Sequence, residues 1–319
     1  MTARSAKLRV PVGLLGALSE LGSGGQGTVY AVSTEAAAKL SLPYTDLAYK
    51  EYDRSARAKL DPDVLDEMAR FGGHLTPDQE GLGTRVAWPL ATVERDGAVS
   101  GFLMRRAREQ FVVDLQLPSG QKRLAEAQHL LNDERFLIDR GLPVHDRWRL
   151  QFLRDTADTL AQLHRNGITV GDLSPKNVLV SFTSRPCCFF LDCDTMRMNN
   201  DSALPQVETP GWYIPKNEER ATSSSDAYKL ALLAIRLFAG DQDSKDIMAL
   251  SAVSRPLGAL AHSGISADPS VRPTPTEWLP ALDAAMPAAA TTLPGEGISA
   301  RGPGGAPTGG PPAPRGQRA

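Results

Sequence analysis

The chain has 319 residues, with 35 lysines and arginines against 37 aspartates and glutamates, which gives a formal net charge of −2. A general nucleic-acid binder would show a strong basic excess, so this balance argues against a nucleic-acid partner. No apolar run approaches the roughly 18 residues that a membrane span needs, and the N-terminus lacks the apolar core of a secretion signal, so we expect no membrane association and a cytoplasmic location.

The three cysteines of the chain, Cys187, Cys188 and Cys193, lie close together in the sequence. Close neighbours rarely form a disulfide framework, and an odd number is typical of a reducing compartment. A structural zinc site would need a fourth ligand and a second cluster, which the sequence does not offer. We therefore interpret the three residues as buried strand thiols.

The first motif is a glycine-rich stretch in which Gly22, Gly24 and Gly27 have the spacing G-x-G-x-x-G, with Val29 close behind. Glycines allow a tight turn and let backbone amides approach phosphates. In a dinucleotide-binding fold a helix would begin at this loop. Here the β-branched and aromatic residues 28–32 predict a second strand, which favours a glycine flap over ATP, with a plain hairpin turn as the alternative.

Two further segments complete the N-terminal half of the predicted nucleotide site. Residues 35–40 read EAAAKL and predict a short strand ending in Lys39, our candidate for the lysine that holds the α- and β-phosphates. The apolar pattern of residues 45–60 predicts a helix. Its Glu51 is the candidate partner of Lys39, with Glu67 in the next helical stretch as a competitor.

The tripeptide Arg95-Asp96-Gly97 separates two apolar stretches within residues 85–104 and predicts a β-hairpin. The second strand would form the back of a nucleotide pocket. Its last residue, Met104, would begin a hinge whose backbone meets adenine.

The chain is organised around residues 168–194, which follow an apolar helix predicted over residues 147–164 and a helix stop at Asn166-Gly167. Carboxylate and amide oxygens suit Mg²⁺, and a carboxylate can also orient a hydroxyl. These are the needs of phosphoryl transfer, where positioning and charge neutralisation supply most of the catalysis. Two strands joined by a loop would bring three such side chains to one end: Asp172, Asn177 and Asp192.

The C-terminal half is predicted to be mainly helical. Residues 228–235 are strongly apolar and predict a buried helix, and Asp226 near its start is either an N-cap or a brace for the loop that carries Asp172. Residues 268–282 predict a turn and a last helix. From about residue 285 the composition becomes Pro, Gly, Ala and Thr, which predicts a disordered tail.

In this order, the motifs resemble the protein-kinase superfamily over residues 15–283. The resemblance implies an α+β, two-lobed protein-kinase-like fold, with an N-terminal antiparallel β-sheet lobe plus one helix and a mainly helical C-terminal lobe. It places the lobes at residues 15–107 and 108–284, between an N-terminal extension (1–14) and the tail (285–319).

The resemblance also implies cofactors and roles. ATP and Mg²⁺ would bind, with Lys39 on the α- and β-phosphates and Glu51 paired with that lysine. Asp172 would be the catalytic base or hydroxyl-orienting residue, and Asn177 and Asp192 would hold Mg²⁺. The nucleotide-binding positions are expected to be Gly22, Gly24, Gly27, Val29, Lys39, Glu51 and Met104.

The finer resemblance is to a bacterial branch of eukaryotic-like kinases. Its members carry a Trp-Pro strand, a Gly-Phe-Leu-Met strand and a Gly-Asp catalytic loop, here Trp88-Pro89, residues 101–104 and Gly171-Asp172. Some members are associated with von Willebrand A-like and phosphatase proteins, which are the partners that this resemblance implies.

Several positions depart from the superfamily. Its His-Arg-Asp is here Val170-Gly171-Asp172, so the arginine that would bind an activation-loop phosphate is missing. The usual lysine two positions after the aspartate is Ser174. The Asp-Phe-Gly motif becomes Asp192-Cys193-Asp194, and Asp194 could be a second metal ligand if the strand continues.

The Ala-Pro-Glu motif ends here in Pro215-Lys216. By resemblance, its glutamate normally pairs with the arginine found at Arg272. That pair is lost unless Glu218 or Glu219 takes its place.

Three functions are compatible with these residues. The leading one is a cytoplasmic kinase that transfers the γ-phosphoryl of Mg-ATP to Ser or Thr of a protein whose identity the sequence does not give. The second is a nucleotide-binding pseudokinase scaffold, favoured by Val170-Gly171, Ser174 and Lys216. The third is a small-molecule kinase, because residues 171–177 resemble the loops of aminoglycoside- and choline-type kinases.

Overall fold

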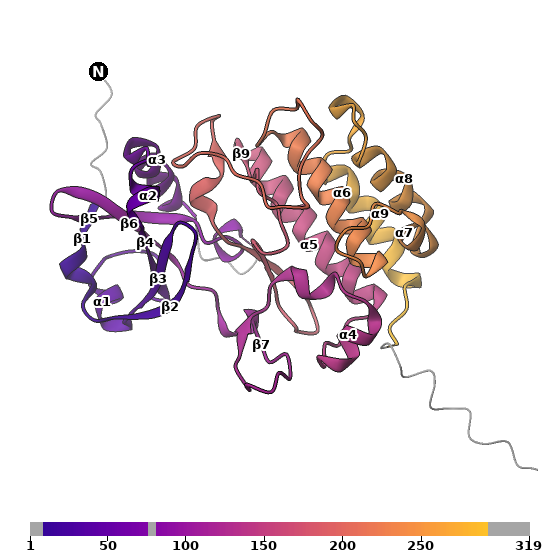
Figure 1. The fold of residues 1–319 in the computed structure, drawn as a ribbon, viewed down its shortest axis with the longest axis horizontal. Coiled ribbons are helices and arrows are strands. Elements are labelled where there is room, and N and C mark those ends of the chain that lie inside the picture. The colour runs from indigo at the N-terminus through magenta and orange to yellow at the C-terminus, as the bar shows by residue number, and fades with distance from the viewer. Residues whose placement is uncertain (1–8, 76–80, 293–319) are drawn as a thin grey trace, which may run out of the picture.

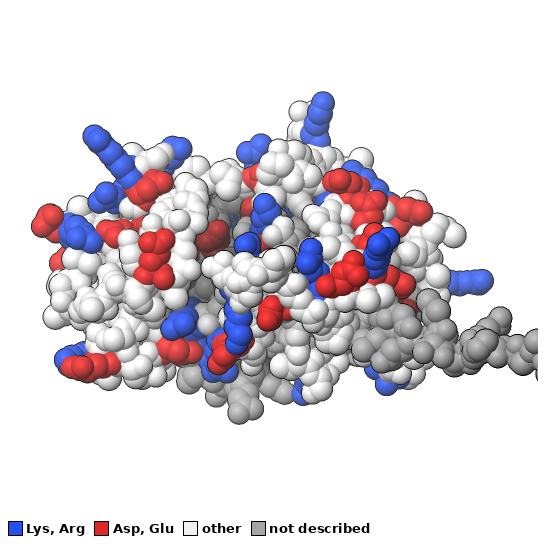
Figure 2. Space-filling view, turned by 60° about the horizontal axis from the view of Figure 1, so that its bottom comes forward, with Lys and Arg blue, Asp and Glu red and all other residues white. Residues whose placement is uncertain are grey.

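The computed structural model describes residues 9–75 and 81–292. Figure 1 shows an N-terminal part built on a β-sheet beside a C-terminal part built mainly from helices. This α+β arrangement is compatible with the two-lobed fold that we expected. On the face shown in Figure 2, basic and acidic side chains are interspersed, in keeping with the net charge of −2. Within the two described ranges, no helix is both long and apolar enough to cross a membrane.

Within the described residues, six strands form the sheet of the N-terminal part, in the order β1-β5-β6-β4-β3-β2. Neighbouring strands are antiparallel, except that β1 runs parallel to β5. The hairpin predicted at Arg95-Asp96-Gly97 is the turn between β5 and β6, where Asp96 and Gly97 both have positive φ. The strands are β1 (Arg9–Pro11), β2 (Leu18–Gly24), β3 (Gly27–Val32), β4 (Leu47–Tyr52), β5 (Pro89–Arg95) and β6 (Ala98–Arg105).

The prediction of a strand that ends at Lys39 is wrong, because this segment is the short helix α1 (Thr34–Ala38). Alanine has the highest intrinsic helix propensity, and the segment contains three in a row. Ser33 caps the first turn by accepting a hydrogen bond from the Ala36 amide at 3.2 Å. Lys39 is the C-terminal cap of this helix and lies outside the sheet.

The helix predicted over residues 45–60 is also wrong. Strand β4 occupies its first half, and the short helix α2 (Arg54–Arg57) follows. β4 lies between β3 and β6, and apolar clusters cover both of its faces, with Tyr49 in one cluster and Tyr52 in the other. A strand that is buried on both faces lacks the alternation of polar and apolar residues that would identify it from sequence.

Helix α3 (Pro62–Gly72) packs on the sheet against β5. The indole nitrogen of Trp88 donates to the Met68 carbonyl at 2.8 Å. At Gly72, an added Cβ would lie 2.0 Å from the carbonyl oxygen of Pro89, so the helix approaches the strand as closely as only glycine permits. Trp88 is therefore a packing residue between helix and sheet.

Helices α5 (Asp146–Arg165) and α6 (Ser223–Ala239) run through the centre of the C-terminal part (Figure 1). α5 confirms the predicted helix over residues 147–164, and Asn166 is its C-cap, just before Gly167 with its φ of 70°. α6 is buried along most of its length, as its apolar sequence predicted. The remaining helices are α4 (Glu134–Asp139), α7 (Met248–Val253), α8 (Arg255–Gly264) and α9 (Pro275–Ala285).

Among the residues that the structure describes, three two-stranded ladders complete the C-terminal part, and one of them pairs with the segment that leads into β5. The Ala87 amide donates to the Phe190 carbonyl at 2.8 Å, and a cluster of buried apolar side chains continues from Phe102 and Met104 of β6 into α5 and α6. The ladders pair β7 (Val112–Val113) with β8 (Arg123–Leu124), β9 (Ile168–Thr169) with β12 (Arg197–Met198), and β10 (Val178–Val180) with β11 (Cys188–Phe190).

All three cysteines are free thiols. Cys188 lies in β11 and is buried, and Cys193 is buried in the turn that follows Asp192. Cys187 is partly exposed and Cys193 lies outside a strand, so only Cys188 confirms our expectation of buried strand thiols. Burial raises the pKa of both Cys188 and Cys193, which keeps them as neutral thiols.

The two ends of the chain are described only in part. Residues 9–11, which we assigned to the N-terminal extension, form β1 and join the sheet. Residues 286–288, at the start of the predicted tail, form a 3₁₀ turn, and the Arg147 guanidinium donates to the Met286 carbonyl at 3.0 Å. The rest of the predicted tail, residues 293–319, lies outside the described residues.

Candidate functional site

A cavity of about 790 Å³ lies between the sheet and the helical part. Its walls come from the β2–β3 hairpin, the end of β6, the β7–β8 hairpin and the residues that follow β11. An apolar cleft with a few placed polar groups is the usual form of a small-molecule site. The apolar side chains that line it include Val29, Ala48, Met104, Phe189 and Leu191.

The glycines of the first motif have two different functions in the hairpin. Gly22 and Gly24 line the cavity, and an added Cβ at either would meet nothing within 4 Å. At Gly27 an added Cβ would lie 1.9 Å from the carbonyl oxygen of Glu51, so this glycine lets β3 lie close against β4. The strand–loop–strand arrangement is confirmed, and the hairpin covers one side of the cavity without side chains at its two outer glycines.

The lysine at the centre of the site is Lys50. It lies on β4 with a side chain that is only 5% exposed, and its Nζ lies 3.1 Å from Asp192 Oδ1 and 2.9 Å from Asp194 Oδ1. It also donates to Gln26 Oε1, in the turn of the glycine hairpin, at 3.0 Å. Burial lowers the pKa of Lys50, but the charges of Asp194 and Asp192 outweigh this effect and raise it, so the amine is held as a cation.

Lys39 and Glu51 do not lie where we expected them. Lys39 is 70% exposed and pairs with Glu35, one helical turn away, at 3.0 Å. Glu51 is on β4 and pairs with Arg95 at 2.8 Å, away from Lys50 because neighbouring strand residues point to opposite faces. Glu67, the competing candidate, is exposed on α3. Lys50 was missed because its strand was taken for a helix.

Asp194 is the buried counter-ion of Lys50. Its carboxylate is fully buried, and both of its oxygens accept hydrogen bonds from Lys50, at 2.9 and 3.0 Å. Tyr52 Oη donates to Asp194 Oδ2 at 2.9 Å. Burial raises the pKa of Asp194, and the positive charge of Lys50 opposes this rise. The geometry therefore corrects our expectation that Asp194 would be a metal ligand, since its oxygens are engaged by Lys50 and Tyr52.

Asp192 faces the cavity from the turn after β11. Its backbone is left-handed, with φ of 51° and ψ of 38°, which is uncommon for a residue other than glycine. This turn leaves its side chain 49% exposed, at the wall of the cavity and in contact with Lys50. Asp192 is thus the carboxylate of the pair that a ligand can reach.

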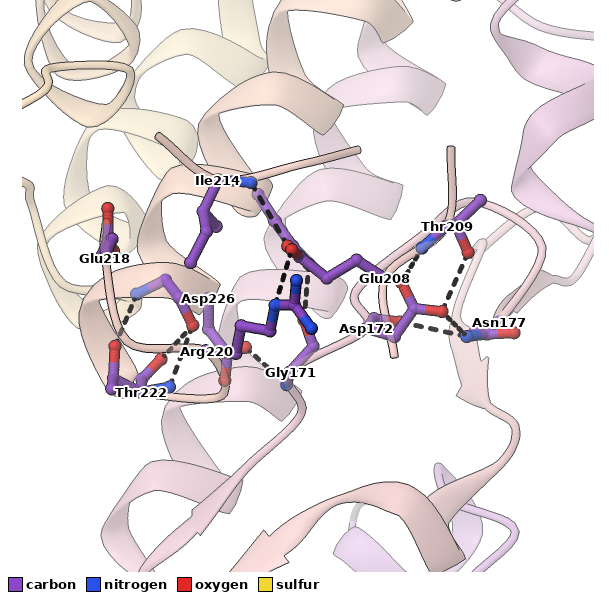
Figure 3. A network of polar contacts seen from close by, with 12 residues as sticks. Gly171, Asp172, Asn177, Glu208, Thr209, Ile214, Glu218, Arg220, Thr222 and Asp226 are labelled. Atoms are coloured by element: carbon purple, nitrogen blue, oxygen red, sulfur yellow. Dashed lines mark hydrogen bonds and ion pairs between the residues drawn. The ribbon is translucent and has the colours of Figure 1, made fainter. Parts of the chain in front are cut away.

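Asp172 is held by a tight set of donors (Figure 3). The Thr209 amide donates to Oδ1 at 3.0 Å, and the Thr209 hydroxyl donates to Oδ2 at 2.8 Å. Asn177 Nδ2 donates to Asp172 Oδ2 at 3.0 Å, which brings the two predicted site residues together. Thr209, from the loop that precedes α6, is a contact that sequence reasoning did not identify.

Asp226 braces the loop that carries Asp172. Its carboxylate is fully buried and accepts hydrogen bonds from the amides of Val170 and Gly171, each at 2.8 Å, and it contacts His164 Nε2 at 3.0 Å. The N-cap of α6 is Thr222. Of the two roles that we considered for Asp226, the structure therefore shows the brace.

The glutamate that ends the Ala-Pro-Glu motif is replaced as the partner of Arg272 by Glu218, two residues after Lys216. Glu218 forms a two-pronged ion pair with Arg272, with N–O distances of 2.6 and 2.7 Å. The Arg272 side chain is completely buried, and Glu219 pairs with Arg197 at 2.8 Å. The Arg272 pair that Lys216 seemed to remove is present through Glu218.

Among the described residues, no group of three or more His, Cys, Asp and Glu side chains is arranged to hold a metal ion. Of the predicted metal positions, Asp192 lines the cavity, and Asn177 contacts Asp172. Met104, the last residue but one of β6, lines the cavity, as do Arg105, Arg106 and Ala107.

A scan against protein-family models finds none that matches the chain, and a search of curated proteins finds no match either. Any function therefore has to be inferred from the residues and their geometry.

Proposed function

We propose that the chain is an ATP-dependent protein kinase with a two-lobed protein-kinase-like fold, which transfers the γ-phosphoryl of Mg-ATP to Ser or Thr hydroxyls. The observation that carries the proposal is the contact of the buried Lys50 with Asp192, which lines the cavity that the glycine hairpin covers, with Nζ 3.1 Å from Oδ1. A half-exposed carboxylate that lines the cavity, held by a buried lysine directly behind it, offers the charges that phosphates and a cation need.

The proposal places the nucleotide by the chemistry of the cavity walls. The adenine ring would lie against Val29, Ala48 and Met104, and its polar edge would meet the backbone after Met104. The phosphates would lie under Gly22 and Gly24, where backbone amides can approach them without hindrance from side chains. Lys50 takes the phosphate-binding role that we first assigned to Lys39.

The residues present fit a magnesium ion bound together with phosphates. Mg²⁺ is usually held by one or two carboxylates, substrate phosphates and waters, so a dedicated cluster of protein ligands is not required. Asp192 would supply a carboxylate oxygen, and Asn177, whose Nδ2 donates to Asp172, would supply its side-chain oxygen. The ion would neutralise the charge that develops on the transferred group.

Asp172 would orient the acceptor hydroxyl and accept its proton. An incoming serine or threonine hydroxyl would take the place of the Thr209 hydroxyl on Oδ2, while the Thr209 amide keeps Oδ1 in position. The Asn177 contact and the Asp226 brace fix the loop, so little reorganisation is needed at the moment of transfer.

A nucleotide-binding pseudokinase is the second candidate, and one observation favours it. Ser174, two positions after Asp172, is buried, and its Oγ has no hydrogen-bond partner in the part of the chain that the structure describes. The superfamily's usual lysine is thus replaced by a buried hydroxyl that carries no charge. The small-molecule alternative is weakened, because the Glu218–Arg272 pair anchors the segment that a protein acceptor would dock on.

Intact-mass spectrometry after incubation with Mg-ATP tests the proposal. The wild type should gain phosphates on Ser or Thr, or phosphorylate a supplied protein mixture, and Lys39→Met should do the same. Lys50→Met, Asp172→Ala and Asp192→Ala should not. Phosphate gain by Asp172→Ala at the wild-type rate would exclude this site as the catalyst. ATP-dependent thermal stabilisation without any transfer would favour the pseudokinase, and transfer to metabolites alone would favour the small-molecule kinase.

A further inference from the structure

The segment before α6 is tied to the catalytic loop by a buried ion pair that the proposed reaction does not itself use. Lys229 of α6 is 1% exposed, and its Nζ lies 2.8 Å from Glu208 Oε1, on a side chain that is 6% exposed. The same amine donates to the carbonyl of Gly171 at 2.7 Å. One cation in the core thus contacts both the residue before Asp172 and the residue before Thr209.

Glu208 also organises the segment in which it lies. Its Oε1 accepts the Ile214 amide at 3.2 Å, which closes the turn that follows Thr209. Its Oε2 pairs with Arg220 at 3.2 Å, and that arginine is 58% exposed. Figure 3 shows these contacts beside those of Asp172 and Asp226. Glu208 is therefore anchored from inside by Lys229 and from outside by Arg220.

The surroundings of Gly171 leave no room for an arginine at this position, so the catalytic loop could not hold the segment through such a side chain. Its φ is +73°, and an added Cβ would lie 2.5 Å from Gln206 Oε1 and 2.8 Å from the Cβ of Ala221. Both neighbours belong to the segment between β12 and α6. The segment fills the space into which a side chain at position 171 would extend, so the loop and the segment are packed directly together.

We infer that Lys229 and Glu208 are positioning residues that hold residues 206–214 permanently on the catalytic loop, so that no phosphate in this segment is needed to order it. In proteins whose segment is ordered by phosphorylation, the added phosphate gains arginine partners. Here a buried carboxylate and a buried ammonium already supply the two opposite charges. Removal of Glu208 takes away the carboxylate that pairs with the buried Lys229 ammonium, and removal of Lys229 leaves the buried Glu208 with only the exposed Arg220, so the pair is a strong local constraint.

The consequence for the site is geometric. Glu208 and Thr209 are adjacent, and Thr209 supplies two of the donors on Asp172. When Lys229 fixes Glu208, it fixes the point from which these donors reach Asp172. The catalytic part of the inference rests on the proposed function, whereas the ordering of residues 206–214 does not depend on it.

Hydrogen exchange of the full-length protein, measured with and without phosphatase treatment, tests the inference. In Lys229→Met, amides of residues 206–214 should exchange about tenfold faster or more, while those of α5 stay unchanged. Turnover should fall about tenfold or more in kcat, with KM for ATP within about threefold, because the change misplaces Asp172 and leaves the nucleotide contacts in place. Arg220→Gln, which removes only the exposed partner of Glu208, is the matched control and should change neither property by more than about twofold.

Three results would overturn the inference. The first is wild-type exchange of residues 206–214 in Lys229→Met. The second is a phosphate on this segment of the wild type whose removal by phosphatase abolishes protection. The third concerns the double variant Lys229→Met/Glu208→Gln, which carries neither charge and replaces the single variant if that one does not fold. Wild-type exchange there would show that packing alone holds the segment. Absence of any transfer by the wild type, with the exchange pattern as expected, would instead count against the proposed function.

Discussion

The Nζ of Lys50 lies 2.9 Å from Asp194 Oδ1, and neither side chain is more than 5% exposed. The two residues are separated by 144 positions in the sequence, so this contact fixes the sheet against the helical part. Asp192, two residues before Asp194, shares the same lysine and reaches the cavity. The arrangement keeps one carboxylate for the lysine and leaves the other for a ligand.

Replacement of Lys50 by methionine should be far more damaging than replacement of Lys39. Lys50→Met leaves the buried Asp194 without its counter-ion, which costs about 3–5 kcal/mol of unfolding free energy. Lys39→Met removes an exposed pair with Glu35 and should stay within about 0.5 kcal/mol of the wild type. Urea denaturation and ATP-binding titrations of both variants check this. Equal losses for the two would contradict the assignment of Lys50.

The Lys50 pair should also leave a mark on the dependence of stability on pH. Burial lowers the pKa of Lys50, and the charges of Asp194 and Asp192 raise it more strongly, so the pKa in the folded state lies above the ordinary value of 10.5. The folded protein therefore holds this proton more tightly than the unfolded chain does. The stabilisation is complete below the ordinary pKa and is lost as the pH rises through the folded-state pKa.

We thus expect the stability difference between the wild type and Lys50→Met to shrink when the pH is raised above that ordinary value. Urea titrations across the alkaline range measure it, with Lys39→Met as the control whose difference from the wild type should stay small throughout. A difference that grows with alkaline pH would show that the lysine is not held as a cation.

Gly27 and Gly25 offer a matched test of the glycine hairpin. Gly27→Ala would place a Cβ 1.9 Å from the Glu51 carbonyl oxygen, so β3 must move away from β4. We expect a loss of about 1–3 kcal/mol, typical of overpacking, and weaker ATP binding because the hairpin no longer covers the cavity in the same position. Gly25→Ala meets nothing within 4 Å and should be close to neutral. Thermal denaturation and nucleotide titration of the two variants decide between them.

Asp226 should be essential for the position of the catalytic loop. Asp226→Ala leaves the amides of Val170 and Gly171 and the His164 ring without their acceptor, and each buried unsatisfied group costs about 1–3 kcal/mol. Asp226→Asn keeps one acceptor oxygen and should retain part of this stability. Calorimetry of both variants, with hydrogen exchange at residues 170–172, measures the order. An alanine variant as stable as the asparagine variant would show that the hydrogen bonds of Asp226 do not contribute to stability.

Local patterns of the sequence were sufficient for several elements. The apolar periodicity and the Asn166-Gly167 stop identified α5 almost to the residue, and Asp96-Gly97 identified the β5–β6 turn. Both signals are local, since periodicity reflects one helix face and a turn needs residues that tolerate positive φ. The Asp172–Asn177 contact was also within reach, because the two residues lie five positions apart.

The lysine of the site could not be identified in the same way. β4 is covered on both faces, so its composition resembled a helix, and the alanine run before Lys39 looked like a strand end when it is a capped helix. The partner of Lys50 comes from more than a hundred residues away, at a position that we read as a metal ligand. A partner chosen across such a distance depends on how the two parts pack, which no window of sequence contains.

The apolar cluster that runs from β6 into α5 and α6 is one continuous core, so the N-terminal and C-terminal parts are packed together beside the cleft. Residues of this shared core, among them Tyr52 and Phe102, are almost completely buried. A protein cut between residues 107 and 108 would present this cluster to water on both fragments, and each fragment would aggregate or unfold. The two parts should therefore unfold in a single thermal transition. A ligand should enter the cavity by displacement of the glycine hairpin, because its outer glycines have no side chains that pack against other residues.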